Sequence, residues 1–155
     1  MAIEVGRQAP VFELSDQQGN GVKLSEFRGR RNVVLVFYPF SFAGVCQGEL
    51  GELRDDVASF EAAGAQLLAV SCDSSFAQAR FAVEQGLDFP VLSDFWPHGQ
   101  VARSYGVFNE ALGCANRATF VIDKAGSVVS RFASADLGTP RVRFEYESAL
   151  GALVG

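Results

Sequence analysis

Cys46 occupies a position where a cysteine thiol could act as a nucleophile. The apolar run at residues 32–38 ends at Pro39, and the loop beginning there leads through Cys46 into a helical pattern that starts near Gln47. We therefore expect Cys46 in or just before the first helical turn, where free backbone N–H groups and the helix dipole favour a thiolate. A thiolate can attack the weak O–O bond of a peroxide and become a sulfenic acid. The alternative is a small buried apolar residue, as most cysteines are, but the constrained loop after Pro39 favours the reactive interpretation.

The other thiols and the one histidine offer less chemistry. The chain has three cysteines and a single histidine, His98, and it contains no C-x-x-C pair. An odd number of cysteines argues against a disulfide framework, and the wide spacing matches no zinc pattern, so we expect no metal site and none at His98. Cys72 ends an apolar run, which favours a core position. Cys114 lies in a polar, glycine-containing loop, which leaves open that it is exposed and is a resolving or modified thiol.

The strands that position Cys46 are the clearest elements of the pattern. Residues 32–38 and 67–72 are continuous apolar runs, which is typical of strands buried on both faces in a parallel sheet. Alternating patterns at 9–16 and 22–24 predict an N-terminal β-hairpin, and residues 119–132 predict a second hairpin around the turn at 123–126.

Helical patterns follow these strands. Residues 47–63 predict a helix that ends before Gly64. A second predicted helix has caps at 73–75, ends at Gly86, and carries the apolar positions Phe76, Ala79 and Val83. Pro97 is placed to begin a short helix that ends near residues 105–106. The last predicted helix has one face with Val142, Tyr146, Leu150 and Leu153.

The order of these elements predicts one α/β domain over residues 1–155, with a mixed central sheet and helices on both faces. The order also suits a thioredoxin-like fold. With 155 residues, 48% of them apolar, the chain can build a core without metals or disulfides. A net charge of −5 disfavours nucleic acid as a partner. No apolar run approaches the roughly 18 residues of a membrane helix, and residues 1–10 lack a signal-peptide core, so we expect a cytoplasmic protein.

The segment from Pro39 to Cys46, P-F-S-F-A-G-V-C, resembles the peroxiredoxin motif P-x-x-x-[T/S]-x-x-C. The resemblance continues along the chain in F-R-G-R-R-N-V-V-L-V-F-Y-P, V-S-C-D-S, F-P-V-L-S-D-F-W-P-H-G, Y-G-V-F-N-E and N-R-A-T-F-V-I-D. Together these segments are similar to the AhpE-type peroxiredoxins of actinobacteria. The resemblance implies a thioredoxin-like fold with a peroxiredoxin N-terminal β-hairpin.

The resemblance also implies roles for four residues. Cys46 would be the peroxidatic cysteine, Pro39 would shield it from solvent, Arg117 would be the active-site arginine, and Glu49 would orient that arginine. A fixed guanidinium can stabilise both a thiolate and the charge that moves onto a leaving oxygen, which agrees with the role of Arg117. The alternatives are a surface charge for Arg117 and an exposed helix-start carboxylate for Glu49.

The activity implied is that of an antioxidant thiol peroxidase that maintains cell redox homeostasis. It would reduce hydrogen peroxide and organic hydroperoxides through a cysteine sulfenic acid, without metal, haem or flavin. Some relatives carry a resolving cysteine five residues after the peroxidatic one, and here Gly51 stands there, so an external small thiol or a redoxin would act as reductant. The resemblance further implies a homodimer or larger homo-oligomer, with the loop from Phe95 to His98 near the subunit interface.

Ala43 departs from the motif, which has threonine or serine at this position. Loss of one charge-assisted hydrogen bond costs roughly 1.5–3 kcal/mol, and in the transition state this corresponds to a rate about 10–150-fold lower. Ser41 lies two residues away, and the sequence leaves open whether it replaces the missing hydroxyl. Two alternative functions remain at this point: a peroxiredoxin-like sensor with weakened peroxidase activity, and a thiol–disulfide oxidoreductase, against which the lack of C-x-x-C argues.

Overall fold

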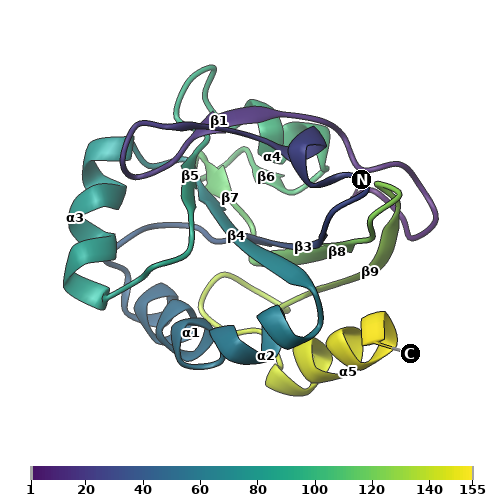
Figure 1. Cartoon of the computed structure of the whole chain (residues 1–155). Coiled ribbons are helices and arrows are strands. Elements are labelled where there is room, and N and C mark those ends of the chain that lie inside the picture. The colour runs from purple at the N-terminus through teal and green to yellow at the C-terminus, as the bar shows by residue number, and fades with distance from the viewer. Residues whose placement is uncertain (1, 155) are drawn as a thin grey trace.

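The computed structural model describes residues 2–154, which form a seven-stranded sheet with the strand order β2-β1-β5-β4-β3-β8-β9 (Figure 1). The central strand β3 pairs parallel with β4 and antiparallel with β8, which confirms the expected mixed sheet. The strands of this sheet are β1 (Glu13–Ser15), β2 (Gly21–Lys23), β3 (Asn32–Phe37), β4 (Ala65–Ser71), β5 (Val91–Ser93), β8 (Ala118–Ile122) and β9 (Val128–Ala133). A separate pair consists of β6 (Phe108–Asn109) and β7 (Cys114–Ala115).

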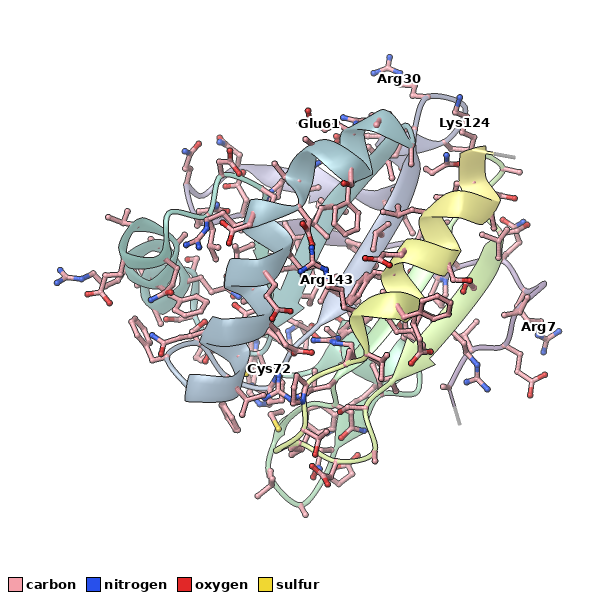
Figure 2. The ribbon with its side chains drawn as sticks, turned by 90° about the horizontal axis from the view of Figure 1, so that it is seen from below. Arg7, Arg30, Glu61, Cys72, Lys124 and Arg143 are labelled. Atoms are coloured by element: carbon pink, nitrogen blue, oxygen red, sulfur yellow. The ribbon has the colours of Figure 1, made fainter. Side chains whose placement is uncertain are left out.

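Helices cover both faces of the sheet, as expected. The helical elements are η1 (Leu24–Phe27), α1 (Gly44–Asp55), α2 (Val57–Ala62), α3 (Ser75–Gln85), α4 (Gln100–Ser104) and α5 (Arg143–Val154). Helices α1, α2 and α5 lie across one face, and α4 lies on the other (Figures 1 and 2). Side chains of β3 alternate between the two cores, with Val34 and Val36 facing α1 and Leu35 and Phe37 facing α4. No helix within residues 2–154 is long and apolar enough to span a membrane.

The first helix differs from its expected bounds in a way that matters for Cys46. Helix α1 begins at Gly44 rather than near Gln47, so Cys46 is the third residue of its first turn. The expected single helix is also interrupted at Asp56, which separates α1 from α2. In Figure 2, Arg143 of α5 lies across from these helices, and its Nη2 donates to Asp56 Oδ1 at 2.8 Å.

The apolar positions named for the helix that becomes α3 do not form its buried face. Phe76 and Val83 are 87% and 80% exposed, whereas Gln78, Phe81 and Ala82 are buried. Apolar residues lie on both faces of this helix, and the face with Phe81 becomes buried because that ring packs against Tyr38 and Phe42, with centroids 6.2 and 5.3 Å away. The expected ends are confirmed, because Ser74 caps the helix and Gly86 ends it at φ 65°.

Other elements confirm or extend the prediction. Both hairpins are present, and α5 packs Tyr146, Leu150 and Leu153 against the core, but Val142 precedes the helix and is 58% exposed. Helix α4 begins at Gln100, three residues after Pro97. Strands β5, β6 and β7 were not expected, since each has only two or three residues and depends on pairing with another segment.

Candidate active site

Cys46 and Arg117 meet at the end of the central strand. Residue Arg117 directly precedes β8, whose Ala118 lies opposite Phe37 at the end of β3. The loop after β3 leads to α1, and this brings Cys46 beside the arginine although 71 positions separate them in the sequence. Arg117 Nη2 donates to Cys46 Sγ at 3.2 Å, and the Cys46 side chain is completely buried. The guanidinium can therefore stabilise negative charge on this sulfur.

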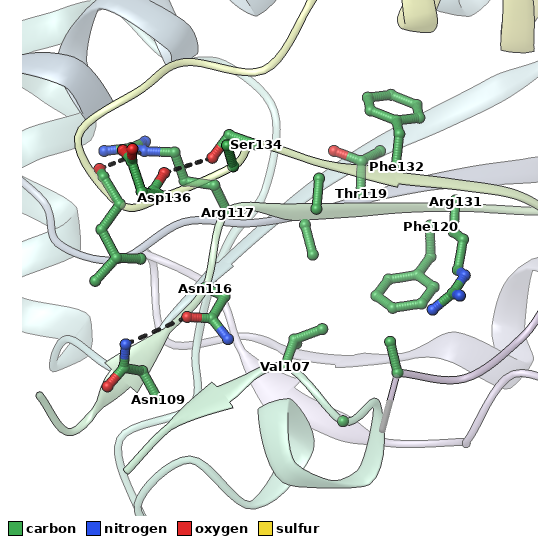
Figure 3. Close-up of a pocket in the computed structure, with 16 residues that line it drawn as sticks. Val107, Asn109, Asn116, Arg117, Thr119, Phe120, Arg131, Phe132, Ser134 and Asp136 are labelled. Carbon is green, nitrogen blue, oxygen red and sulfur yellow. Dashed lines mark hydrogen bonds between the residues drawn. The ribbon is translucent and has the colours of Figure 1, made fainter. Parts of the chain in front are cut away.

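Three hydrogen bonds fix the guanidinium of Arg117. Besides the bond to Cys46, Nη1 donates to Glu49 Oε1 at 2.6 Å and Nε donates to the Leu137 carbonyl at 2.8 Å. Figure 3 shows Arg117 beside the loop that carries Ser134 and Asp136. Arg117 is only 3% exposed, so the alternative of a surface charge is wrong.

Glu49 lies one turn after Cys46 and is buried, which contradicts the alternative of an exposed carboxylate. Its two oxygens bind Arg117 and also Arg141, whose Nη2, Nε and backbone N donate at 2.8, 3.0 and 2.6 Å. Burial of the carboxyl group opposes its ionisation, but the charge and hydrogen bonds of Arg141, with the bond from Arg117, hold the pKa of Glu49 below its usual value.

Arg141 is the site residue that the sequence did not reveal. Its Nη1 donates to the Phe37 carbonyl at 2.6 Å and to the Ala118 carbonyl at 3.0 Å, so it joins β3 and β8 to the segment after β9. That segment has neither a helical nor a strand period, and one arginine after Pro140 is an ordinary surface pattern. Two arginines and one glutamate leave a single positive charge, which a thiolate at Cys46 would balance.

The loop between β3 and α1 contains the other expected residues. Pro39 is buried where β3 ends, while Phe40 and Phe42 are 41% and 44% exposed. Ser41 Oγ pairs with Tyr38 OH at 3.0 Å, and among the described residues it forms no hydrogen bond with Cys46. Ala43 is the N-cap of α1 and provides no side-chain cap.

The remaining thiols are buried and free of disulfides. The exposure that we left open for Cys114 is wrong, since this residue lies in β7 with no exposed area, and the core position expected for Cys72 is confirmed. Burial raises the pKa of the Cys72 thiol to about 12, helped by the negative charge of Asp94, and burial also raises the pKa of Cys114. Both thiols are therefore poor nucleophiles near neutral pH.

Two further features lie away from Cys46. His98 places its ring nitrogens against the carbonyl oxygens of Phe95 and Gly113, at 3.2 and 2.7 Å. In the described part of the chain, no three His, Cys, Asp or Glu side chains form a cluster that could hold a metal ion. A cavity of about 720 Å³ includes Arg117, Arg131 and Asp136 in its lining (Figure 3), but Cys46 does not line it.

Comparison with known proteins decides which family carries this arrangement. Residues 5–131 match the AhpC/TSA family. The chain belongs to this family, the peroxiredoxins. It is 49% identical over 131 residues to the alkyl hydroperoxide reductase E of Mycobacterium tuberculosis, with 84% of each chain covered.

Solved structures agree with this assignment. Peroxidoxin BcpB of M. tuberculosis superposes with a TM-score of 0.85 at 32% identity, covering 97% of this chain and 96% of the other. AhpC of Enterococcus faecalis gives 0.87 at 30% identity, covering 98% and 92%. The expected thioredoxin-like fold and the resemblance to AhpE-type peroxiredoxins are confirmed. This peroxiredoxin is a thiol-dependent peroxidase that acts on hydroperoxides with a thiol or redoxin as reductant, and neither alternative function is favoured.

Ala43→Thr is expected to speed peroxide reduction about 10-fold, equivalent to roughly 1.4 kcal/mol in the transition state. A threonine hydroxyl at this position can donate a hydrogen bond where negative charge moves between sulfur and peroxide, and Ala43 offers no such donor. The side chain is partly exposed, so the larger threonine has room. Stopped-flow oxidation compares the two proteins at several pH values, which separates thiolate fraction from positioning. A folded variant that reacts no faster would show that the missing hydroxyl does not limit the rate.

Proposed function

We propose that Cys46 is the peroxidatic cysteine of this peroxiredoxin and that Arg117 and Glu49 assist it. The observation that carries the proposal is the 3.2 Å contact between Arg117 Nη2 and Cys46 Sγ, on a guanidinium that Glu49 also binds. A guanidinium held in this way needs no rearrangement when charge develops during the reaction. Arg141 adds a positioning role, because it fixes Glu49 from the opposite side.

The first step forms a sulfur–oxygen bond and breaks the O–O bond of the hydroperoxide. The thiolate of Cys46 attacks the distal oxygen, and two electrons pass from sulfur to the peroxide. The other oxygen leaves as hydroxide or alkoxide and takes a proton from solvent to give water or an alcohol. Arg117 and the free N–H groups of the first turn of α1 stabilise the charge that shifts between the oxygens. Cys46 becomes a sulfenic acid.

Pro39 limits the contact of this sulfur with water in our proposal. The residue is buried between the end of β3 and the exposed Phe40, so its ring fills space beside the loop that leads to Cys46. A dry site strengthens the interaction between the thiolate and Arg117, because water screens charge more effectively than protein atoms do.

Recycling of the sulfenic acid uses an external thiol. A small thiol or a redoxin attacks the sulfenic sulfur, water leaves, and a second thiol then releases Cys46 from the mixed disulfide. Because Cys46 has no exposed area, the loop before it must move before such a reductant can reach the sulfur. The raised pKa values of Cys72 and Cys114 support the proposal that neither residue resolves the sulfenic acid by forming a disulfide with Cys46.

Limiting peroxide followed by mass spectrometry tests this proposal. We expect the first oxygen on Cys46, as a sulfenic acid that dithiothreitol reverses, and no stoichiometric disulfide to either other cysteine. Oxygen that appears first elsewhere would contradict the role of Cys46. A quantitative Cys46–Cys114 or Cys46–Cys72 disulfide would instead make the partner cysteine a resolving residue.

We also propose that the chain is a single domain that forms a homodimer in the cytoplasm. Trp96 and Phe76 are 81% and 87% exposed, and Phe95 is 50% exposed. Phe95 and Trp96 follow β5, and Phe76 lies in the first turn of α3 after β4, so all three come after the ends of neighbouring parallel strands. Exposed apolar residues in such a group are typical of a protein interface. Sedimentation equilibrium should give twice the monomer mass, and a monomer at micromolar concentration would contradict it.

A further inference from the structure

The loop between β3 and α1 is attached to the neighbouring strand by Asp73. Its Oδ2 accepts a hydrogen bond from the Ser41 backbone N–H at 2.8 Å and another from Ser71 Oγ at 2.7 Å. Asp73 lies just beyond β4, which runs parallel to β3, so the carboxylate and the loop share one edge of the sheet. The contact joins residues 32 positions apart.

Buried side chains hold this carboxylate in turn. Gln78 Nε2 donates to Ser71 Oγ at 2.9 Å and to the Leu92 carbonyl at 2.8 Å, and neither Gln78 nor Ser71 has exposed area. The connection therefore runs from the loop through Asp73 and Ser71 to β5. Gln78 Oε1 is buried without a hydrogen-bond partner in the described chain. Such an acceptor is costly, so the side chain gives up one hydrogen bond while its amide nitrogen holds this connection.

The loop needs such an anchor. Phe42, next to Ser41, has a φ of 71°, a left-handed conformation that residues other than glycine avoid and that persists only where the surroundings hold it. The Ser41 side chain is fixed as well, through Tyr38 OH. Ala43 supplies no side-chain hydrogen bond where α1 begins. The Ser41 amide is thus a fixed point only five residues before Cys46.

We propose that Asp73 is a positioning residue for peroxide reduction. Through the Ser41 amide, its carboxylate sets the path of the loop and thereby the placement of Cys46 and the first-turn N–H groups against Arg117. Asp73 does not touch the peroxide, and it acts through the loop. This inference rests on the proposed role of Cys46 in the peroxidase reaction.

The test compares three variants by stopped-flow oxidation and by the pH dependence of Cys46 alkylation. Asp73→Ala removes the acceptor, and we expect the rate constant of the thiolate with peroxide to fall about 10-fold or more. The pH midpoint of Cys46 alkylation should stay the same or move down. The variant removes the negative charge of Asp73, and a negative charge near Cys46 disfavours its thiolate. Asp73→Asn keeps an acceptor oxygen and should recover part of the rate. A lower rate with an undiminished thiolate fraction is a result that general destabilisation would not give.

Ser74→Ala is the matched control. It removes the Ser74 Oγ that accepts from Ala77 N at 3.2 Å and caps α3, next to Asp73, but it leaves the contact with Ser41 intact. The folded control should react at the wild-type rate. Folded Asp73→Ala that reacts as fast as the control would overturn the proposal. If Asp73→Ala does not fold, Ser71→Ala takes its place, with a smaller fall expected and an unchanged rate counting against the proposal.

Failure of the proposed function would be recognised separately. If wild-type Cys46 is not oxidised by peroxide, the proposed function is wrong, and the attachment is then judged by hydrogen exchange of the Ser41 amide. Faster exchange at Ser41 in Asp73→Ala than in Ser74→Ala would support the attachment. Equal exchange in the two variants would overturn it.

Discussion

Cys46→Ser is expected to lower peroxide turnover by on the order of 1000-fold or more, down to the rate without protein. Serine keeps the size of the side chain, but its hydroxyl stays protonated in water and cannot supply the sulfur nucleophile. The neighbouring Arg117, Glu49 and Arg141 remain, so the variant keeps its buried charge cluster. Turnover with hydrogen peroxide and dithiothreitol, measured as peroxide consumed, gives the comparison directly.

Cys72→Ala provides the control for this experiment. Burial raises the pKa of Cys72 to about 12, so its thiol contributes little thiolate and its removal should change the peroxide rate by no more than a few-fold. Circular dichroism and thermal unfolding establish that both variants are folded. Turnover that persists in folded Cys46→Ser would move the reaction to another residue and end the assignment of Cys46.

Arg117→Ala is expected to slow peroxide attack about 100–1000-fold, equivalent to roughly 2.7–4 kcal/mol of lost transition-state stabilisation. The variant removes the donor 3.2 Å from Cys46 Sγ, so the pH midpoint of alkylation at Cys46 should also rise. Breaking a buried ion pair is usually destabilising. Here Glu49 keeps its bonds to Arg141, so the folded state should survive.

Arg117→Lys separates charge from geometry in the same site. Lysine carries one ammonium group and cannot reach Cys46, Glu49 and the Leu137 carbonyl together as the planar guanidinium does. We expect the pH midpoint of Cys46 alkylation to rise less in the lysine variant than in Arg117→Ala, because a positive charge remains. The lysine variant should still react slowly with peroxide. If Arg117→Ala leaves both the alkylation profile and the peroxide rate unchanged, Arg117 has a structural role only.

The strongest elements of the fold were predictable because their patterns have one interpretation. The apolar run of β3 is buried along its whole length, and the turn at 123–126 joins β8 and β9 as its residues indicate. The buried face of helix α3 was harder to predict, since Phe76 and Phe81 lie on different faces. Only the contacts of Phe81 with Tyr38 and Phe42 decide which face is buried. Strand β5 has three residues, and its pairing with β4 is what defines it.

Some residues of the candidate site could likewise be predicted from the sequence, and others could not. Cys46, Arg117 and Glu49 lie at or near the ends of recognisable elements and resemble family positions, so they could be named from the sequence, and the geometry brings them together. Arg141 lies in a segment without periodicity, and its contacts with Glu49 and Phe37 depend on how that segment crosses the sheet. The attachment of Ser41 to Asp73 uses a backbone N–H, which no side-chain pattern can reveal.

The position of Arg141 has a consequence for the protein during its synthesis. Its bonds to Glu49 join residues 92 positions apart, and they complete a cluster in which Arg117 also reaches back 68 positions to Glu49 and 71 positions to Cys46. A nascent chain that has released Cys46 and α1 from the ribosome still lacks both arginines. The thiol therefore emerges without the charges that would stabilise its anion, and the complete site forms only after Arg141 has been translated.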